Sequence, residues 1–271
     1  MAARELRPPL IVIGTTRSAP RAAILLLTLV CTFGCASAKR YGSLAAHDVA
    51  ALVTAPKRAT PAQWKRAALA VGAIAASAAL DERVRDASRA NQSRAADNIA
   101  KIVEPFGGRY GDRVLYGFLL AGAATGNDKA KAIAFDGLVS SLLATKVAVP
   151  LLKQAVGRDR PNEAEGAFEF HGGSSFPSSH ATHAFAIATV VAAHSDSRWV
   201  DAGAYSLATL VGAARIRHDA HWLSDVVAGA AIGTATARFI IATNDRRRAT
   251  WSVAPIVGEG RRGVVMRVVS R

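Results

Sequence analysis

The sequence contains very little cysteine and few aromatic residues. Only two of its 271 residues are cysteine, and both, Cys31 and Cys35, lie near the N-terminus. The main body of the chain therefore has no disulfide framework and no thiol nucleophile. Aromatic residues make up 6% of the chain against 51% for all apolar residues, and alanine and glycine supply much of the apolar share. A β-sandwich would need more Val, Ile, Tyr and Thr, so the composition favours an all-α fold of closely packed helices.

The first 38 residues have the pattern of an export signal. Four arginines precede an apolar run over 22–30, and small residues follow up to Ala38. We predict that 1–38 is a secretory signal peptide, because the run is shorter than the roughly 20 residues that span a bilayer. The protein is then expected on the periplasmic side of a bacterial envelope. Two processing routes remain open: cleavage after Ala38, or lipidation of Cys35 in a lipoprotein-like box that would anchor the protein to a membrane.

The rest of the chain divides into three parts. We expect a linker at 39–63, a helical domain at 64–243, and a basic C-terminal segment at 244–271 with a small β-hairpin. The predicted domain is a single bundle of about six core helices, at 64–80, 115–125, 129–156, 181–194, 199–216 and 223–243. A charged stretch ends the first helix near 81–89, and 90–113 reads as a loop or short helix. Charged residues inside the longer runs favour buried helices of a peripheral bundle, although membrane spans remain open.

Three polar clusters lie at the predicted helix ends, and the first contains Lys153, Arg160 and Pro161. Gly157 is suited to end the preceding helix, and Pro161 prevents its resumption. Two cations one turn apart can bind different oxygens of one phosphoryl group. The same residues would also suit a solvated helix end.

The second cluster, Pro177, Ser178, Ser179 and His180, opens the helix that follows. Backbone N–H groups and hydroxyls at a helix N-terminus bind anions, and a histidine there can donate a proton to a leaving group. Ordinary helix capping explains the serines equally well.

The third cluster runs from Arg215 to His221 and Asp225. If His221 begins the last long helix, then Asp225 lies one turn further on the same face. A carboxylate that holds one imidazole nitrogen leaves the other free to attack. A structural His–Asp pair is the alternative.

Together the clusters read Lys-x6-Arg-Pro, Pro-Ser-x-His and Arg-x5-His-x3-Asp. In this order they resemble the type 2 phosphatidic acid phosphatase superfamily, which includes bacterial class A acid phosphatases and vanadium haloperoxidases. The resemblance implies that His221 is the nucleophile, that Asp225 orients it, and that His180 protonates the leaving oxygen. It also implies a set of groups that hold the phosphate, and no metal or other cofactor. The phosphate-binding set is Lys153, Arg160, Ser178, Ser179 and Arg215.

Two positions depart from the family pattern, which has Gly where Ser179 stands and Ser where Ala214 stands. Neither change removes a reacting group. Five further residues could extend the site towards a diphosphate or a headgroup, although each also suits a surface or packing role. They are Arg158, His171, His183, Arg217 and His218. The acidic loop 162–176, between two prolines, is placed to gate access to the site.

The resemblance implies a metal-independent phosphatase for phosphomonoesters or diphosphates. We expect lipid phosphates as substrates, a membrane surface as partner and no nucleic-acid partner; the net charge of +14 suits anionic partners. Three alternatives are kept: a non-specific soluble periplasmic acid phosphatase, a non-catalytic phosphate-binding envelope protein, and a vanadium haloperoxidase.

Overall fold

The structure is a computed structural model that describes residues 59–248, 251–258 and 261–268. The predicted export segment 1–38, Cys35, and most of the predicted linker 39–63 lie outside these residues. Within them the body of the chain is helical, as the composition indicated. The strands β1 (Trp251–Gly258) and β2 (Arg261–Val268) follow it and pair antiparallel.

Each of the six predicted runs overlaps a helix, and the first, 64–80, continues two residues beyond the end of its helix at Ala78. The helices are α2 (Pro61–Ala78), α3 (Asp81–Ala90), α4 (Arg94–Val103), η1 (Glu104–Gly107), α5 (Arg109–Thr125), α6 (Asp128–Leu142), η2 (Leu143–Ala148), α7 (Val149–Val156), α8 (Ser179–His194), α9 (Arg198–Arg217) and α10 (Leu223–Arg248). The first helix ends at Ala78, just before the charged stretch, and that stretch forms a separate helix, α3. Its N-terminal Asp81 and Glu82 suit the positive end of the helix dipole. The predicted loop or short helix at 90–113 contains α4, η1 and the start of α5.

Local sequence sets the helix boundaries. A capping box between Thr60 and Gln63 starts α2, and Pro61 occupies its first turn. The long run 128–156 is one continuous helix with a π-helical segment, η2, just before Pro150. Proline cannot donate a backbone hydrogen bond and crowds the preceding turn, and the wider π turn accommodates this. The run ends at Gly157 in the left-handed conformation, with φ of 63°.

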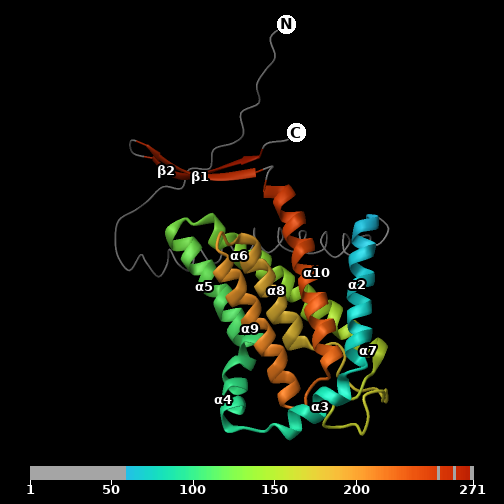
Figure 1. Cartoon of the computed structure of the whole chain (residues 1–271). Coiled ribbons are helices and arrows are strands. Elements are labelled where there is room, and N and C mark those ends of the chain that lie inside the picture. The colour runs from blue at the N-terminus through green and yellow to red at the C-terminus, as the bar shows by residue number, and fades with distance from the viewer. Residues whose placement is uncertain (1–58, 249–250, 259–260, 269–271) are drawn as a thin grey trace. The chain divides into compact units, whose positions relative to one another are not determined.

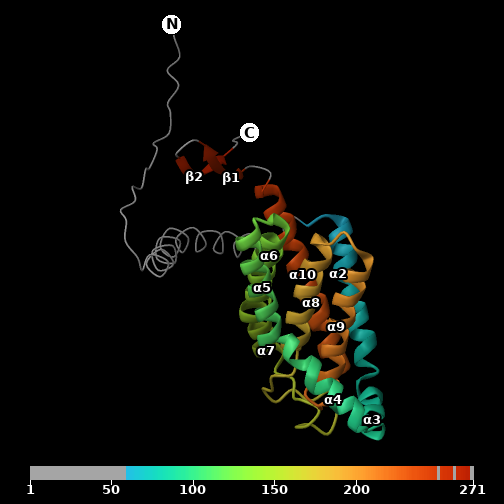
Figure 2. The same cartoon turned by 90° about the vertical axis from the view of Figure 1, so that its left-hand side faces the viewer.

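The helices α2, α5, α6, α8, α9 and α10 lie side by side with nearly parallel axes (Figures 1 and 2). Small residues form much of the core between them; one cluster consists of Ala184, Ala188, Ala208 and Val211. The closest approach is between α8 and α10. A β-carbon at Gly229 would lie 2.6 Å from the carbonyl oxygen of Ser178, and one at Gly233 would overlap that of Thr182. The two glycines thus let α10 pack directly on the backbone of α8.

This packing gathers the polar clusters at one end of the bundle. The N-termini of α8 and α10, the C-termini of α7 and α9, and the loop 157–178 all lie there (Figure 1). The backbone N–H of Ser178 donates to the carbonyl of Asp225 over 3.0 Å, which ties the second cluster to the third. Among the described residues, Asp128–Val156 and Leu223–Asp245 are long and apolar enough to cross a membrane. About half of the first window is buried inside the bundle, as a core helix of a peripheral protein would also be.

Candidate active site

His221 lies at the centre of the gathered clusters. Its side chain is 3% exposed, and its Nδ1 lies 3.6 Å from Oδ2 of Asp225. The helix α10 begins at Leu223, as the apolar run 223–243 predicted, so His221 lies two residues before it. The pair still forms, because His221 immediately precedes the first turn. Burial lowers the pKa of His221, and the Asp225 carboxylate offsets part of this effect. A neutral imidazole is the form that can act as a nucleophile.

Asp225 is completely buried and held from several sides. Its Oδ2 accepts hydrogen bonds from the backbone N–H of Trp222 at 2.9 Å and from Ser175 Oγ at 2.5 Å. Its Oδ1 accepts from Arg158 Nη1 at 2.9 Å. Burial alone would raise the pKa of Asp225, but contacts with His221, Arg158 and Ser175 lower it below the usual value. The carboxylate is therefore ionised and fixed in place beside His221.

Arg158 has the packing role that the sequence left open for it. It is not an extension of the site towards a second phosphate: its side chain is 4% exposed, and all its nitrogens have partners. Besides Asp225, it contacts Asp81 Oδ2 at 2.7 Å, Ser224 Oγ and the carbonyl of Ala167. Asp81, the first residue of α3, also accepts from the backbone N–H of Ser224 at 2.8 Å. A buried chain of charges thus links α3, the loop and α10. The sequence around Asp81 did not indicate this link, because its partners Arg158 and Ser224 lie far along the chain.

The predicted phosphate-binding cations surround the same place. Lys153 Nζ donates to the carbonyls of Ser174 and Ser175. Burial, followed by repulsion from Arg160, lowers the pKa of Lys153 to about 8. Arg160 Nη2 donates to Ser174 Oγ over 3.3 Å. Lys153 is close enough to Arg160, Arg215 and Asp225 for all three charges to act on it. The structure therefore brings the first and third clusters together.

Arg215 carries an unused donor. It is 9% exposed, and its Nη1 donates to Glu104 Oε1. Its Nε is buried, and no described residue accepts a hydrogen bond from it. Burial lowers the pKa of Arg215, and Glu104 offsets part of this effect. A buried guanidinium N–H without a protein acceptor is a natural partner for an anionic ligand.

His180 and the two serines complete the site at the N-terminus of α8. Ser178 is the N-cap and fully buried, and Ser179 is the first residue of the helix. His180 follows and lines an open cavity. Burial, and then the positive charge of Arg215, lowers the pKa of His180 to about 4. His221 also acts on His180 electrostatically. All three clusters therefore lie close enough together for their charged groups to act on one another.

The other candidates serve the surrounding structure. His183 contacts Asp112 at 3.0 Å and His218 contacts Glu104 at 2.5 Å. Arg217 contacts Asp97 at 2.8 Å and also two backbone carbonyls. Glu104, which the sequence analysis did not single out, thus holds both Arg215 and His218. Only the structure reveals its role, because it lies about 110 residues away from both partners.

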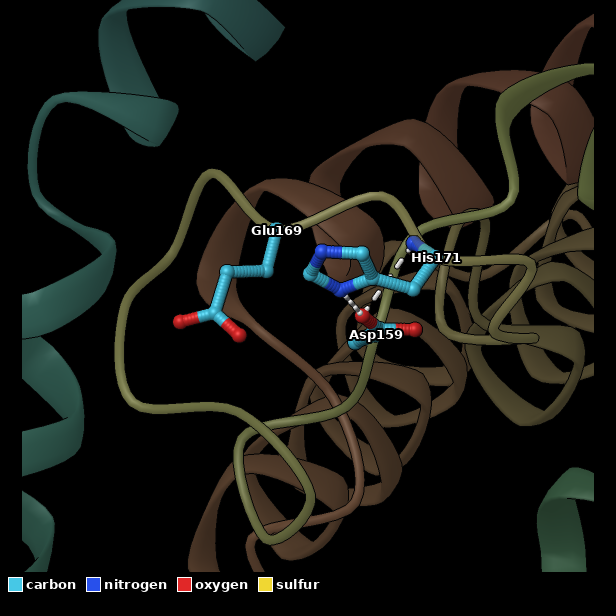
Figure 3. A group of neighbouring side chains, drawn as sticks. All are labelled: Asp159, Glu169 and His171. Carbon is cyan, nitrogen blue, oxygen red and sulfur yellow. Dashed lines mark hydrogen bonds and ion pairs between the residues drawn. The ribbon is translucent and has the colours of Figure 1, made fainter.

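The acidic loop 162–176 is tied to the residues before it. Figure 3 shows Asp159, Glu169 and His171, whose ligand atoms lie close enough together to suit a metal ion. These groups also satisfy one another and the backbone. His171 Nδ1 contacts Asp159 Oδ2 at 2.7 Å, Glu169 Oε1 accepts from the N–H of Gly166, and the N–H of Asp159 donates to the carbonyl of Glu169. We interpret the trio as a brace that shapes the loop.

Comparisons with known proteins find relatives for the part of the chain that holds this site. Residues 136–249 match the family model of the PAP2 superfamily. The match includes every predicted site residue. The resemblance predicted from the three clusters is confirmed by this match.

Individual relatives cover different parts of the chain. A stretch of 83 residues, 30% of this chain, is 37% identical to the lipid A 1-phosphatase of Porphyromonas gingivalis; it covers only 17% of that protein's length. The crystal structure of a transmembrane PAP2-type phosphatidylglycerolphosphate phosphatase from Bacillus subtilis aligns with a TM-score of 0.50 at 19% identity, over 68% of this chain and 97% of that one. Aquifex aeolicus LpxE aligns with a TM-score of 0.48 at 23% identity, over 60% and 95%. At 19% identity the Bacillus subtilis alignment bears on the fold alone.

Proposed function

We propose that this protein is a metal-independent phosphatase that hydrolyses lipid phosphates through a phosphohistidine at His221. The observation that carries the proposal is the buried His221–Asp225 pair, on which the charges of Lys153 and Arg215 act. Arg215 also has a buried Nε–H for which the described residues offer no acceptor. A phosphoryl group is the ligand that satisfies these donors together.

The proposed reaction has two steps. In the first, Nε2 of His221, the ring nitrogen away from Asp225, attacks phosphorus. The bond to the leaving oxygen breaks, and that oxygen takes a proton from His180. In the second, His180 takes a proton from water, the resulting hydroxide attacks phosphorus, and the P–N bond breaks to regenerate His221. Lys153, Arg160 and Arg215, with Ser178 and the N–H of Ser179, stabilise the charge on the equatorial oxygens.

The lipid character of the substrate and the site of action are also part of the proposal. The relatives named above include a lipid A phosphatase and a phosphatidylglycerolphosphate phosphatase. The basic net charge of +14 suits an anionic membrane surface. The predicted signal segment would deliver the protein to the periplasmic side, with Cys35 as a second, lipid-anchored route.

Phosphate release from phosphatidic acid in detergent micelles tests the activity. We expect release to persist in EDTA and to fall by at least about 10⁴-fold in His221→Ala, as for other catalytic nucleophiles. Substrate labelled with ³²P should leave acid-labile, alkali-stable label on the wild-type protein and none on His221→Ala. His171→Ala, in the loop brace, is the matched control and should retain both activity and label. Activity that disappears with EDTA, or that survives in His221→Ala, would show the proposal to be wrong.

A further inference from the structure

A cavity of about 480 Å³ opens beside His180. It is lined by Lys101, Glu104, Pro105, Gly108, Arg109 and His180. Apart from His180, these residues come from one stretch that joins α4 to α5 through η1. In the proposed reaction His180 protonates the leaving oxygen. The cavity therefore lies on the side of the site where the leaving group emerges.

The wall of this cavity is held against His180. A β-carbon at Gly107 would lie 2.8 Å from Cβ of His180 and 2.9 Å from its carbonyl oxygen. The η1 turn can contact the first turn of α8 only because residue 107 has no side chain. The residues on either side of Gly107 are thus at a fixed position relative to His180.

The uncompensated charge in the cavity is positive. Lys101 and Arg109 are exposed, and neither forms an ion pair within the described part of the chain. Arg109 instead lies over the ring of Tyr110, with its guanidinium carbon 5.2 Å from the ring centroid. Glu104 is the one carboxylate among the lining residues, and it is already paired with Arg215 and in contact with His218. Two free cations therefore border the path of the leaving group.

We propose that Lys101 and Arg109 form a subsite for a second anionic group, carried by the leaving group of the substrate. This inference rests on the proposed function. It identifies the preferred substrates as phosphate esters whose leaving group is itself an anion: a diphosphate, or a lipid with a phosphodiester close to the scissile phosphate. An ammonium and a guanidinium form charge-assisted hydrogen bonds with such groups. Esters of neutral alcohols leave the subsite empty.

Two matched substrate pairs test the inference. Farnesyl diphosphate is compared with farnesyl phosphate, and phosphatidylglycerol phosphate with phosphatidic acid, all in the same detergent. Within each pair only the first has an anionic leaving group. We expect the full-length wild-type protein to favour the first member of at least one pair in kcat/KM. A preference confined to the farnesyl pair identifies a diphosphate, and one confined to the lipid pair identifies the phosphodiester.

The variant Lys101→Ala/Arg109→Ala should lose this preference. Removing two charge-assisted contacts should reduce the ratio of kcat/KM within the pair by about 10- to 100-fold. Lys65→Ala/Arg66→Ala, which removes two exposed cations from α2, is the control for net charge and should leave the ratio unchanged. The charge-keeping variant Lys101→Arg/Arg109→Lys should restore most of the preference.

The failures of the two proposals can be told apart. If the wild-type protein hydrolyses none of the four substrates, then the proposed function is wrong. If it hydrolyses them without a preference in either pair, or if the α2 control lowers the ratio as much as the subsite variant, then the subsite is wrong while the phosphatase remains.

Discussion

At the scale of residues, the proposed reaction depends on which group holds one proton. Burial lowers the pKa of His221, and burial with Arg215 lowers that of His180 to about 4. Near neutral pH both imidazoles are therefore neutral in the free protein. A neutral imidazole suits the proposed nucleophile, His221, but the proposed acid, His180, needs a proton. A phosphate monoester has a second pKa of about 6 and can bring that proton as the monoanion.

The expected pH dependence follows from this proton balance. Below about pH 6 the substrate is a monoanion, and the complex holds the proton that His180 requires. Above that pH the proton is lost, so kcat/KM for a phosphomonoester should fall about tenfold per unit. Loss of the Lys153 charge above its pKa of about 8 should steepen the fall. Initial rates between pH 5 and 9 measure this profile. A kcat/KM that rises towards pH 8 would contradict the assignment of His180.

At the scale of elements, Arg158 joins three segments that are far apart in the sequence. It bridges Asp81 of α3 and Asp225 of α10 from within the loop, and all three side chains are buried. Removal of one member leaves buried charges without partners, which costs about 3–5 kcal/mol in comparable networks. The network therefore supports both stability and the orientation of Asp225 towards His221.

We expect Arg158→Ala to lower the free energy of unfolding by about 3–5 kcal/mol and to reduce kcat strongly. Urea denaturation measures the first effect, and phosphate release at a temperature where the variant is folded measures the second. Arg89→Ala breaks the more exposed ion pair with Asp219 and should cost less than about 1 kcal/mol. If Arg158→Ala is as mild as this control, then the buried link does not hold the site together.

The contact between α8 and α10 gives a second prediction at this scale. A methyl group at Gly233 would overlap the carbonyl oxygen of Thr182, so Gly233→Ala must separate the two helices. We expect Gly233→Ala to lower the free energy of unfolding by about 1–3 kcal/mol or more. Activity should also fall, because α8 positions Ser178 and His180. Gly117→Ala adds the same methyl group where nothing lies within 4 Å and should stabilise the protein by about 0.5–1 kcal/mol. Thermal unfolding of both variants tests the prediction, and equal melting temperatures for the two variants would contradict it.

The same elements show what sequence reasoning could reach. The apolar runs predicted the long helices, and the order of the three clusters predicted that His180, Arg215 and His221 meet. The helices in the polar segments were harder to predict from the sequence, because α3 and α4 have few buried apolar residues. Residues far away in the sequence, such as Arg158 and Arg217, stabilise them. The role of Arg158 could not be predicted from the sequence either, because its partners are also far away in the sequence. A buried arginine and a phosphate-binding arginine look alike until Asp81 is placed beside it.

At the scale of the whole molecule, charge and exposed apolar side chains both suit a lipid surface. The net charge is +14. Large apolar side chains are exposed on α2 and α5 and in the loop beside the site, among them Trp64, Leu69, Val71, Tyr116, Leu120, Phe168 and Phe170. Charge attracts a protein to anionic headgroups over a distance set by salt, whereas apolar contacts act only at the surface and are insensitive to salt. The two contributions can therefore be separated by ionic strength.

We expect the full-length protein to bind vesicles that contain phosphatidylglycerol more tightly than vesicles of phosphatidylcholine alone. At 1 M salt the Debye length is about 3 Å, so the difference between the vesicles should vanish while a weaker, apolar binding to both remains. Flotation of vesicles across a salt series measures both parts. The Cys35→Ala variant removes any acyl anchor and should behave like a protein cleaved after Ala38. Equal binding to both vesicles at low salt would eliminate the role of charge, and complete release at 1 M salt would eliminate the apolar contact.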